Sequence, residues 1–333
     1  MVQFGRFQNK VITILSLTIA VVITSCTNET KNDNTNPPVK TATVPRIPAP
    51  DFNADSAYSF VKAQVDFGPR IPGTPAHAKC AEYLVAKLKS YGFEVIVQTG
   101  TIPTFDKKQF TLKNIIASYK PDVQSRVMLC SHWDSRPWAD ADKKDPDKPF
   151  DSANDGPSGV GVALEVAHQV SIKHPNAGVD IFFFDLEDYG EPGGDNDSWC
   201  LGSQYWAKNI HKPNYYANFG VLLDMVGGPN AYFPKEAKSV EYASTAVDKV
   251  WKAANDIGYG NYFAPQTKDF VGIDDHIIVN KAGVPCIDII EYNQASGGFG
   301  DYHHTHKDNM SIIDKNTLKA VGQTLLEVIY NEK

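Results

Sequence analysis

The chain contains 333 residues, of which 39 are acidic and 32 are basic, so its formal net charge is −7. No run of Lys and Arg is long enough to follow a phosphate backbone, which argues against a nucleic acid as partner. From Asp51 onward the sequence has neither an internal linker nor a repeat. We therefore expect one domain over residues 51–333, although the length would also fit two smaller ones.

The N-terminus has the pattern of an export signal. Arg6 and Lys10 precede an apolar stretch over residues 11–23, which is too short to cross a bilayer as a mature helix. The stretch ends in Ile-Thr-Ser-Cys, an arrangement typical of a bacterial lipoprotein cleavage site. We predict a lipoprotein signal peptide over residues 1–26 with lipidation of Cys26. An ordinary secretory signal cut nearby is the alternative.

Residues 27–50 are dominated by Asn, Thr, Lys and Pro. Such a segment has too little apolar surface to offset the entropy lost on ordering, so we expect a flexible tether. Together these features predict an exported bacterial lipoprotein at a periplasm-facing or cell-surface membrane, attached to the membrane only through its lipid. We expect the protein to be a monomer.

Helices and strands alternate along the remaining sequence. Helical spacing of apolar residues predicts helices over residues 76–91, 158–172, 201–210, 240–257, 274–282 and 314–330. Alternating or continuously apolar runs predict strands over residues 93–98, 114–119, 126–130, 179–184, 219–226 and 284–290. This order favours a sheet with parallel centre strands that is covered by helices on both faces.

Beyond Cys26 the chain has four cysteines, Cys80, Cys130, Cys200 and Cys286. They do not occur in close pairs, so a structural zinc site built from cysteines is not expected. In an exported protein one disulfide would be compatible with this set, and free buried thiols are the alternative.

Polar residues follow several of the most apolar strands. His132 and Asp134 come after one, Glu187 and Asp188 after the next, and Asp224 lies within a third. In open α/β sheets the functional crevice lies at the carboxyl ends of the strands. Acidic residues that recur at this end of buried strands therefore suggest a metal site.

Two further segments supply candidate ligands. Asp155 stands directly before a predicted helix, where backbone N–H groups can hold a carboxylate. Near the C-terminus His303, His304 and His306 lie together, and at most one or two of them can be ligands because neighbouring side chains diverge. Zinc accepts nitrogen and carboxylate oxygen, and a catalytic site keeps one position open. Each segment by itself would also fit a surface turn or a buried structural histidine.

The order of these residues resembles the co-catalytic zinc aminopeptidase family and, within it, the glutaminyl cyclases. The resemblance covers most of the chain from Phe67 onward. The residues that carry it are His132, Asp134, Asp155, Glu187, Asp188, Asp224 and His304. Two segments, 223–230 and 274–277 with Gly283-Val284-Pro285 after it, are similar to the cyclases rather than to the peptidases. The resemblance implies a single three-layer α/β/α domain with a mixed, centrally parallel twisted sheet.

The resemblance also implies roles for the site residues. Asp155, Asp188 and His304 would bind one Zn²⁺ per chain, and Glu187 would be the proton shuttle. In many relatives the residue at position 188 is Glu, which is one methylene longer than Asp188. An Asp still ligates zinc, so this difference changes the local geometry rather than the identity of the ligand.

The remaining roles concern the pocket. Asp224 and Asp274 would form a hydrogen-bonded acidic pair, and Trp199 would be one of the aromatic walls. His303 replaces a tryptophan of animal cyclases, which changes the lining on that side. His132 and Asp134 would be second-metal ligands or outer-shell partners. We interpret residues 139–150 as a solvated insertion, with a mobile flap over the pocket as the alternative.

These roles imply a zinc-dependent glutaminyl-peptide cyclotransferase, which converts the N-terminal Gln of peptides or proteins to pyroglutamate and releases ammonia. One alternative is a two-zinc aminopeptidase, in which His132 and Asp224 complete a second metal site. The cyclase is favoured because Asp274 offers Asp224 a competing carboxyl partner, and a carboxylate that shares a proton is a poorer ligand. A non-catalytic surface lipoprotein with a degenerate pocket is the second alternative.

Overall fold

The computed structural model describes residues 47–333, which belong to one compact unit. The predictions for the signal peptide, for Cys26 and for most of the tether lie outside the described residues. Among the residues that are described, no helix combines the length and the apolar character needed to cross a membrane.

A mixed six-stranded sheet forms the centre of the unit, in the order β1-β2-β4-β3-β5-β8. Its strands are β1 (Glu94–Pro103), β2 (Gln109–Tyr119), β3 (Arg126–His132), β4 (Gly178–Phe184), β5 (Phe219–Asp224) and β8 (Cys286–Ile290). The strands β4, β3, β5 and β8 run parallel, whereas β1 and β2 form a hairpin antiparallel to β4. The predicted mixed sheet with parallel centre strands is confirmed.

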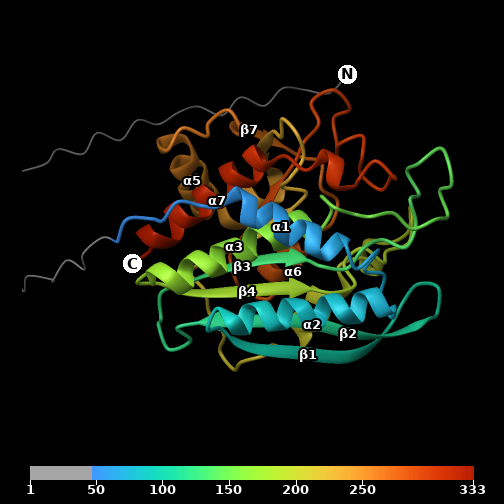
Figure 1. Ribbon diagram of the computed structural model, residues 1–333, viewed down its shortest axis with the longest axis horizontal. Helices are drawn as coiled ribbons and strands as arrows, with labels where there is room; N and C mark the ends of the chain where they lie inside the picture. The colour runs from blue at the N-terminus through green and yellow to red at the C-terminus, as the bar shows by residue number, and fades with distance from the viewer. Residues whose placement is uncertain (1–46) are drawn as a thin grey trace, which may run out of the picture. The chain divides into compact units, whose positions relative to one another are not determined.

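Helices cover both faces of this sheet (Figure 1). They are α1 (Ala54–Val65), α2 (Pro75–Ser90), α3 (Pro157–Lys173), α4 (Leu201–Lys208), α5 (Ala237–Asp256), α6 (Asp275–Lys281) and α7 (Lys315–Asn331). Alternate strand residues face opposite layers, so Leu129 belongs to the core cluster that includes residues of α1, α2, α3, α5 and α7, whereas Cys130 belongs to the cluster that includes residues of α4 and α6. This arrangement is the predicted α/β/α sandwich.

Several short elements were not predicted from the sequence. They are α1, the two-stranded parallel sheet of β6 (Phe233–Glu236) and β7 (Phe263–Lys268), and the 3₁₀ turns η1 (Asn196–Ser198) and η2 (Met310–Ile312). The helix α1 begins at Asn53, whose side chain accepts the N–H groups of Asp55 and Ser56. Its buried stripe includes Gln64, which weakens the apolar periodicity that would have revealed it.

All four cysteines in the described chain are free and buried. The Sγ atoms of Cys130 in β3 and Cys286 in β8 lie 3.9 Å apart, and β5 is the strand between β3 and β8. Of the two alternatives left open by the sequence, the structure has buried thiols.

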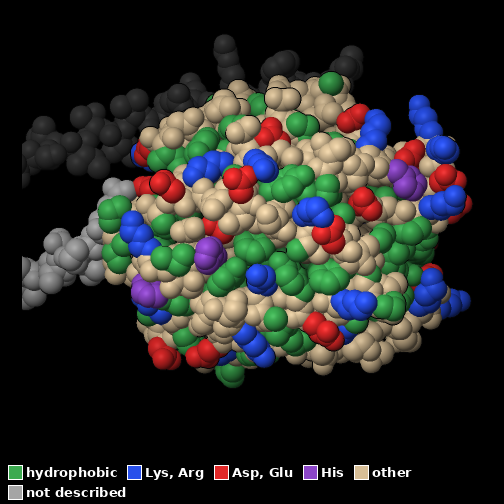
Figure 2. Space-filling view, viewed as in Figure 1, with side chains coloured by type: hydrophobic (Ala, Val, Ile, Leu, Met, Phe, Trp, Pro, Cys, Tyr) green, Lys and Arg blue, Asp and Glu red, His purple; other side chains and the backbone are tan. Residues whose placement is uncertain are grey.

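The molecular face that carries α1, α2 and α3 shows Lys and Arg side chains interspersed with Asp and Glu (Figure 2). The large apolar side chains with the greatest exposure are scattered over separate elements, for example Ile172 on α3 and Tyr242 on α5. Isolated apolar side chains of this kind are normal on a folded protein and mark no site.

Candidate active site

The carboxyl ends of three parallel strands bring the predicted polar residues together. His132 ends β3, Glu187 and Asp188 follow β4, and Asp224 ends β5. Asp155 lies in the turn before α3 and belongs to the same group. The Nε2 atom of His132 lies 2.9 Å from Asp155 Oδ1 and 3.3 Å from Asp224 Oδ1. The side chains predicted from scattered segments therefore form one buried cluster.

The three predicted ligands meet on one side of this cluster. His304 Nε2 lies 3.2 Å from Asp188 Oδ1 and 3.6 Å from Asp155 Oδ2. Asp155 Oδ2 and Asp188 Oδ2 are both buried without a hydrogen-bond partner among the described residues. A buried carboxylate oxygen without a donor is costly unless a cation neutralises it. One imidazole nitrogen and two carboxylates are a donor set that fits Zn²⁺.

A carboxylate near the C-terminus holds the loop of Asp155. Asp308 accepts the backbone N–H groups of Ala153 at 3.0 Å, Asn154 at 2.7 Å and Asp155 at 3.1 Å. Asp308 was not predicted from the sequence, because no periodicity marks a side chain that binds backbone groups far away along the chain. Since Asp308 and His304 belong to one segment, that segment fixes two of the predicted ligands at once.

Asp134 fixes the segment of the paired acids. Its carboxylate accepts the backbone N–H of Glu187 at 3.1 Å and that of Asp188 at 3.3 Å, and its Oδ1 atom lies 3.6 Å from His132 Nδ1. The preceding Leu186 has φ +55°, a left-handed conformation that turns the chain sharply after β4. Asp134 thus orients the two acids through their backbone N–H groups, and it also lies close to His132.

Glu187 faces the pocket beside the predicted ligands. Its Oε1 atom accepts a hydrogen bond from Cys200 Sγ at 3.2 Å, a contact that was not predicted from the sequence. Burial raises the pKa of Glu187 well above its usual range, His132 opposes this shift, and the negative charge of Asp188 adds to it. A carboxyl with a raised pKa in a pocket can both accept and return a proton near neutral pH.

The predicted partner of Asp224 lies on the same wall of the pocket. Asp274 caps α6, and its carboxylate lies within 4.8 Å of ligand atoms of His276 and Asp288. Burial and then the repulsion from Asp224 and Asp275 raise the pKa of Asp274 well above its usual range. Asp274 therefore tends to hold a proton, and Asp288 extends the acidic cluster beyond the pair that was predicted.

The pocket above these acids is a cavity of about 290 Å³. Trp199 and His303 both line it, as predicted, whereas Trp138 packs against Phe105 and Tyr189. The Trp199 ring stacks with the His304 ring at a centroid distance of 6.2 Å, and the His303 ring stacks at 3.7 Å. Burial and then the neighbouring His304 lower the pKa of His303 to about 3, so its imidazole is neutral.

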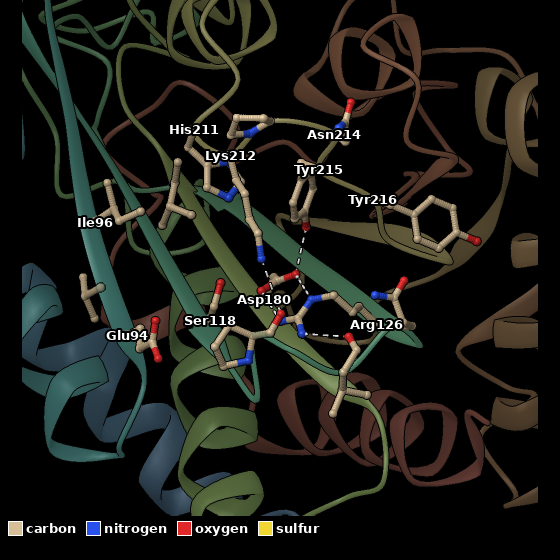
Figure 3. Close-up of a pocket in the computed structure, with 16 residues that line it drawn as sticks. Glu94, Ile96, Ser118, Arg126, Asp180, His211, Lys212, Asn214, Tyr215 and Tyr216 are labelled. Carbon is tan, nitrogen blue, oxygen red and sulfur yellow. Dashed lines mark hydrogen bonds and ion pairs between the residues drawn. The ribbon is translucent and has the colours of Figure 1, made fainter.

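A larger cavity, of about 550 Å³, lies near the amino ends of β3 and β4 (Figure 3). The Arg126 guanidinium and the Asp180 carboxylate form a bidentate pair there, at 2.5 and 2.8 Å, and the Tyr215 hydroxyl donates to Asp180 at 3.0 Å. These buried groups satisfy one another, unlike the orphaned oxygens of the smaller pocket. We therefore assign the chemistry to the smaller pocket.

Comparisons with known proteins show the family of the chain. The model of peptidase family M28 matches residues 114–329. A glutaminyl cyclase of Bacteroides thetaiotaomicron, solved with N-acetylhistamine, is 50% identical, with a TM-score of 0.84 over 86% of this chain and 100% of that chain. A structure described as a leucine aminopeptidase precursor from the same species is also 50% identical, with a TM-score of 0.83 over 86% and 100%.

A curated relative points in the same direction. The glutaminyl-peptide cyclotransferase of Drosophila melanogaster is 26% identical over 269 residues, which cover 74% of this chain and 72% of that protein. The resemblance predicted from the sequence is thereby confirmed. The chain belongs to peptidase family M28, in the group that contains the bacterial glutaminyl cyclases.

Proposed function

We propose that this chain is a zinc-dependent glutaminyl-peptide cyclotransferase with one Zn²⁺, held by Asp155, Asp188 and His304. The observation that carries the proposal is the position of Glu187. Its carboxyl group faces a small pocket directly beside the three candidate ligands, and its pKa is raised. The 50% identity to a bacterial glutaminyl cyclase over the full length of that chain supports the same activity.

The reaction joins the α-amine of an N-terminal Gln to its own γ-carboxamide carbon. A new C–N bond closes the lactam ring, the bond to the amide nitrogen breaks, and ammonia leaves. When bound, Zn²⁺ would act as a Lewis acid toward the γ-carbonyl oxygen. One proton must move from the attacking amine to the leaving nitrogen, so a single group close to both can perform both transfers.

Glu187 is placed to move that proton. In its ionised form the carboxylate accepts a proton from the attacking amine, and in its protonated form it returns the proton to the leaving nitrogen. The Cys200 thiol donates to Oε1 and keeps the side chain oriented toward the pocket. Burial raises the pKa of Glu187, which favours the protonated form more than in an exposed Glu.

The pocket walls favour a folded Gln side chain over an extended peptide. Trp199, Phe299 and Ile290 give the cavity apolar sides, and its volume of about 290 Å³ suits one residue. Holding the amine against the carboxamide replaces an encounter between separate groups with an intramolecular reaction. Water is not a reactant in this cyclisation, so a pocket that excludes water also suppresses competing hydrolysis.

A two-metal aminopeptidase is the second candidate. The specific observation in its favour is that ligand atoms of His132, Asp155 and Asp224 lie within 4.8 Å of one another. A second metal would need Asp224 as an ionised ligand. Burial and then the repulsion from Asp224 raise the pKa of Asp274 well above its usual range, and burial also raises the pKa of Asp224, which disfavours an ionised Asp224. We therefore favour one metal and cyclisation.

A paired assay distinguishes these two functions. Purified protein is incubated with a dipeptide that begins with Gln and, separately, with a leucine chromogenic amide. Release of ammonia from the first without free amine from the second is the result expected for a cyclase. Release of amine without ammonia would show that the chain is a peptidase. Zinc analysis should give about one ion per chain for the cyclase, and a firm two would favour the peptidase.

We also propose that the protein is exported and attached to a membrane through a lipid on Cys26, which follows the apolar segment of residues 11–23. Replacing Cys26 with Ala should move the protein from the membrane fraction to the soluble fraction of the expressing cells. Retention of the Cys26→Ala variant in membranes would contradict lipid attachment at this residue.

A further inference from the structure

The segment over residues 139–150 contacts the C-terminal histidines at its beginning. Asp140 Oδ1 lies 3.2 Å from His304 Nδ1, and the backbone N–H of Ala141 donates to the His304 carbonyl at 3.1 Å. Most residues after these are exposed, as expected for a solvated insertion. Asp140 and Ala141 differ from these exposed residues, because both contact His304, which we propose as a zinc ligand.

Asp142 binds His306, the last of the three histidines near the C-terminus. Asp142 Oδ2 accepts the backbone N–H of His306 at 3.0 Å and lies 3.0 Å from His306 Nδ1. His306 is therefore an anchor for the loop rather than a ligand of the pocket. His304, two residues earlier, has φ +53°, which is costly for a residue with a side chain. The contacts of Asp140 and Ala141 with His304, and those of Asp142 with His306, hold His304 in this conformation.

A buried arginine connects this contact to the other side of the site. Arg136 donates to Asp140 through Nε at 2.8 Å and Nη2 at 2.6 Å, a bidentate geometry that fixes the carboxylate plane. Its Nη1 atom donates to the backbone carbonyls of Asp188 at 3.0 Å and Gly190 at 3.2 Å. The guanidinium also lies over the Trp199 ring, 4.6 Å from its centre. The Arg136 guanidinium thus contacts Asp140, the backbone at Asp188 and Gly190, and Trp199 in the pocket wall.

We infer that Asp140, fixed by Arg136, is a positioning residue for His304 and sets the affinity of the site for zinc. By accepting the Nδ1–H of His304, Asp140 selects the tautomer whose Nε2 lone pair is free. That Nε2 atom faces Asp155 and Asp188. This inference rests on the zinc ligands of the proposed function, and it adds a role for a residue outside the pocket lining.

The test is the zinc affinity of Asp140→Asn, measured by competition with a zinc-chelating dye. The amide cannot supply a full negative charge to Arg136 and to His304 Nδ1–H, so we expect a 10- to 100-fold weaker affinity. Asp140→Glu, which restores the charge, should recover part of the loss. Asp145→Asn is the matched control, because Asp145 lies in the same segment and its carboxylate lies 3.1 Å from the Nζ atom of exposed Lys148. It should keep the wild-type affinity.

Two readouts separate positioning from a general loss of structure. The melting temperature of the metal-free Asp140→Asn protein should equal that of metal-free Asp145→Asn within a few degrees. The visible spectrum of the Co²⁺-substituted protein should change in Asp140→Asn, because the orientation of His304 is altered. Wild-type zinc affinity together with an unchanged Co²⁺ spectrum in Asp140→Asn would overturn the inference.

The zinc-affinity test of Asp140→Asn does not depend on whether the enzyme is a cyclase. If the wild-type protein binds zinc but does not cyclise Gln peptides, the proposed function fails, while weaker zinc binding by Asp140→Asn still supports the inference. If His304→Ala binds zinc as tightly as the wild type, the proposed ligand set fails, and the role inferred for Asp140 fails with it. Tight zinc binding by Asp140→Asn beside a weak His304→Ala variant contradicts the role of Asp140 alone.

Discussion

At the level of single residues, left-handed backbone conformations gather around the site. Leu186, Cys200, Met225 and His304 have φ values of +55°, +54°, +48° and +53°, and each is, adjoins or contacts a candidate functional residue. Such conformations cost about 1–3 kcal/mol each and persist only where surrounding contacts determine them. The hydrogen bonds that Asp134 accepts from the N–H groups of Glu187 and Asp188, directly after Leu186, are contacts of this kind. The site is therefore held by its neighbours rather than by local backbone preference.

Replacing Glu187 with Gln should remove turnover without removing the metal. The amide keeps the size of the side chain but cannot carry the proton, so kcat should fall about 100- to 10,000-fold. Zinc content should stay that of the wild type, because the proposed ligands are unchanged. Glu191→Gln, at an exposed position in the following loop, is the matched control and should keep full activity. Near-normal rates in Glu187→Gln would show that another group moves the proton.

Glu291 should impose a pH dependence on stability. It accepts a hydrogen bond from Tyr302, and burial raises its pKa from 4.5 to about 7. Since the folded protein holds this proton more tightly than the unfolded chain, the contribution of Glu291 to stability is lost as pH rises from about 4.5 to about 7. Each pKa unit corresponds to about 1.4 kcal/mol.

The test compares Glu291→Gln with the wild type by chemical denaturation at several pH values. Gln can still accept from the Tyr302 hydroxyl but has no proton to lose, so the decline between pH 4.5 and 7 should become shallower. Parallel stability profiles of the two proteins across this pH range would contradict the assignment.

At the level of elements, the turn before α3 places Asp155 against the end of β3. Gly156 has φ +84°, and a Cβ atom there would lie 2.8 Å from His132 Cε1. The first turn of α3 can therefore approach the strand ends only with glycine at this position. The start of α3 and its close approach to His132 therefore both depend on Gly156.

Gly156→Ala should consequently lower both stability and zinc affinity. We expect a loss of at least about 1 kcal/mol from backbone strain, with a further loss because His132 must move. Gly92→Ala is the control, since Gly92 has φ +77° but no atom within 4 Å of an added Cβ. It should lose stability but keep the zinc affinity of the wild type. Equal zinc affinity in both variants would mean that this close approach has no role in the site.

The residues at the amino ends of β3 and β4, near the larger cavity, should contribute to the stability of the protein but not to its activity. Tyr215→Phe removes one donor from the buried Asp180 carboxylate, which should cost about 1–3 kcal/mol in chemical denaturation. Tyr216→Phe, whose side chain is 58% exposed, should stay within about 0.5 kcal/mol of the wild type. The specific activity of both variants should be unchanged. A selective loss of activity in Tyr215→Phe would instead make the larger cavity part of the catalytic machinery.

At the level of the whole molecule, the central sheet could be predicted because its centre strands are buried on both faces. Residues 179–184 and 219–226 are mostly apolar, interrupted by Asp180 and Asp224, and β4 and β5 are buried along their whole length. The sheet of β6 and β7 could not be predicted, because β6 has four residues and β7 is half exposed. Short strands carry too few residues to establish a period.

The site was predictable to the extent that it follows the strand ends. Glu187, Asp188 and Asp224 come directly from that rule, and the resemblance supplied the roles of Asp188 and His304 as ligands. Asp308 and Arg136 escaped prediction because they bind backbone groups across long sequence separations, and Asp140 because its role depends on its contacts with Arg136 and His304. No periodicity reports such contacts. The sequence therefore predicts the reactive groups better than the groups that hold them.

The most direct test of the account is the mass of the product formed from one peptide that begins with Gln. Cyclisation predicts a product that keeps every residue and has lost one molecule of ammonia. Hydrolysis by an aminopeptidase would instead yield free Gln and a peptide shorter by its first residue. Mass spectrometry of a single reaction distinguishes the two outcomes. The shortened peptide as the main product would contradict the proposed cyclase.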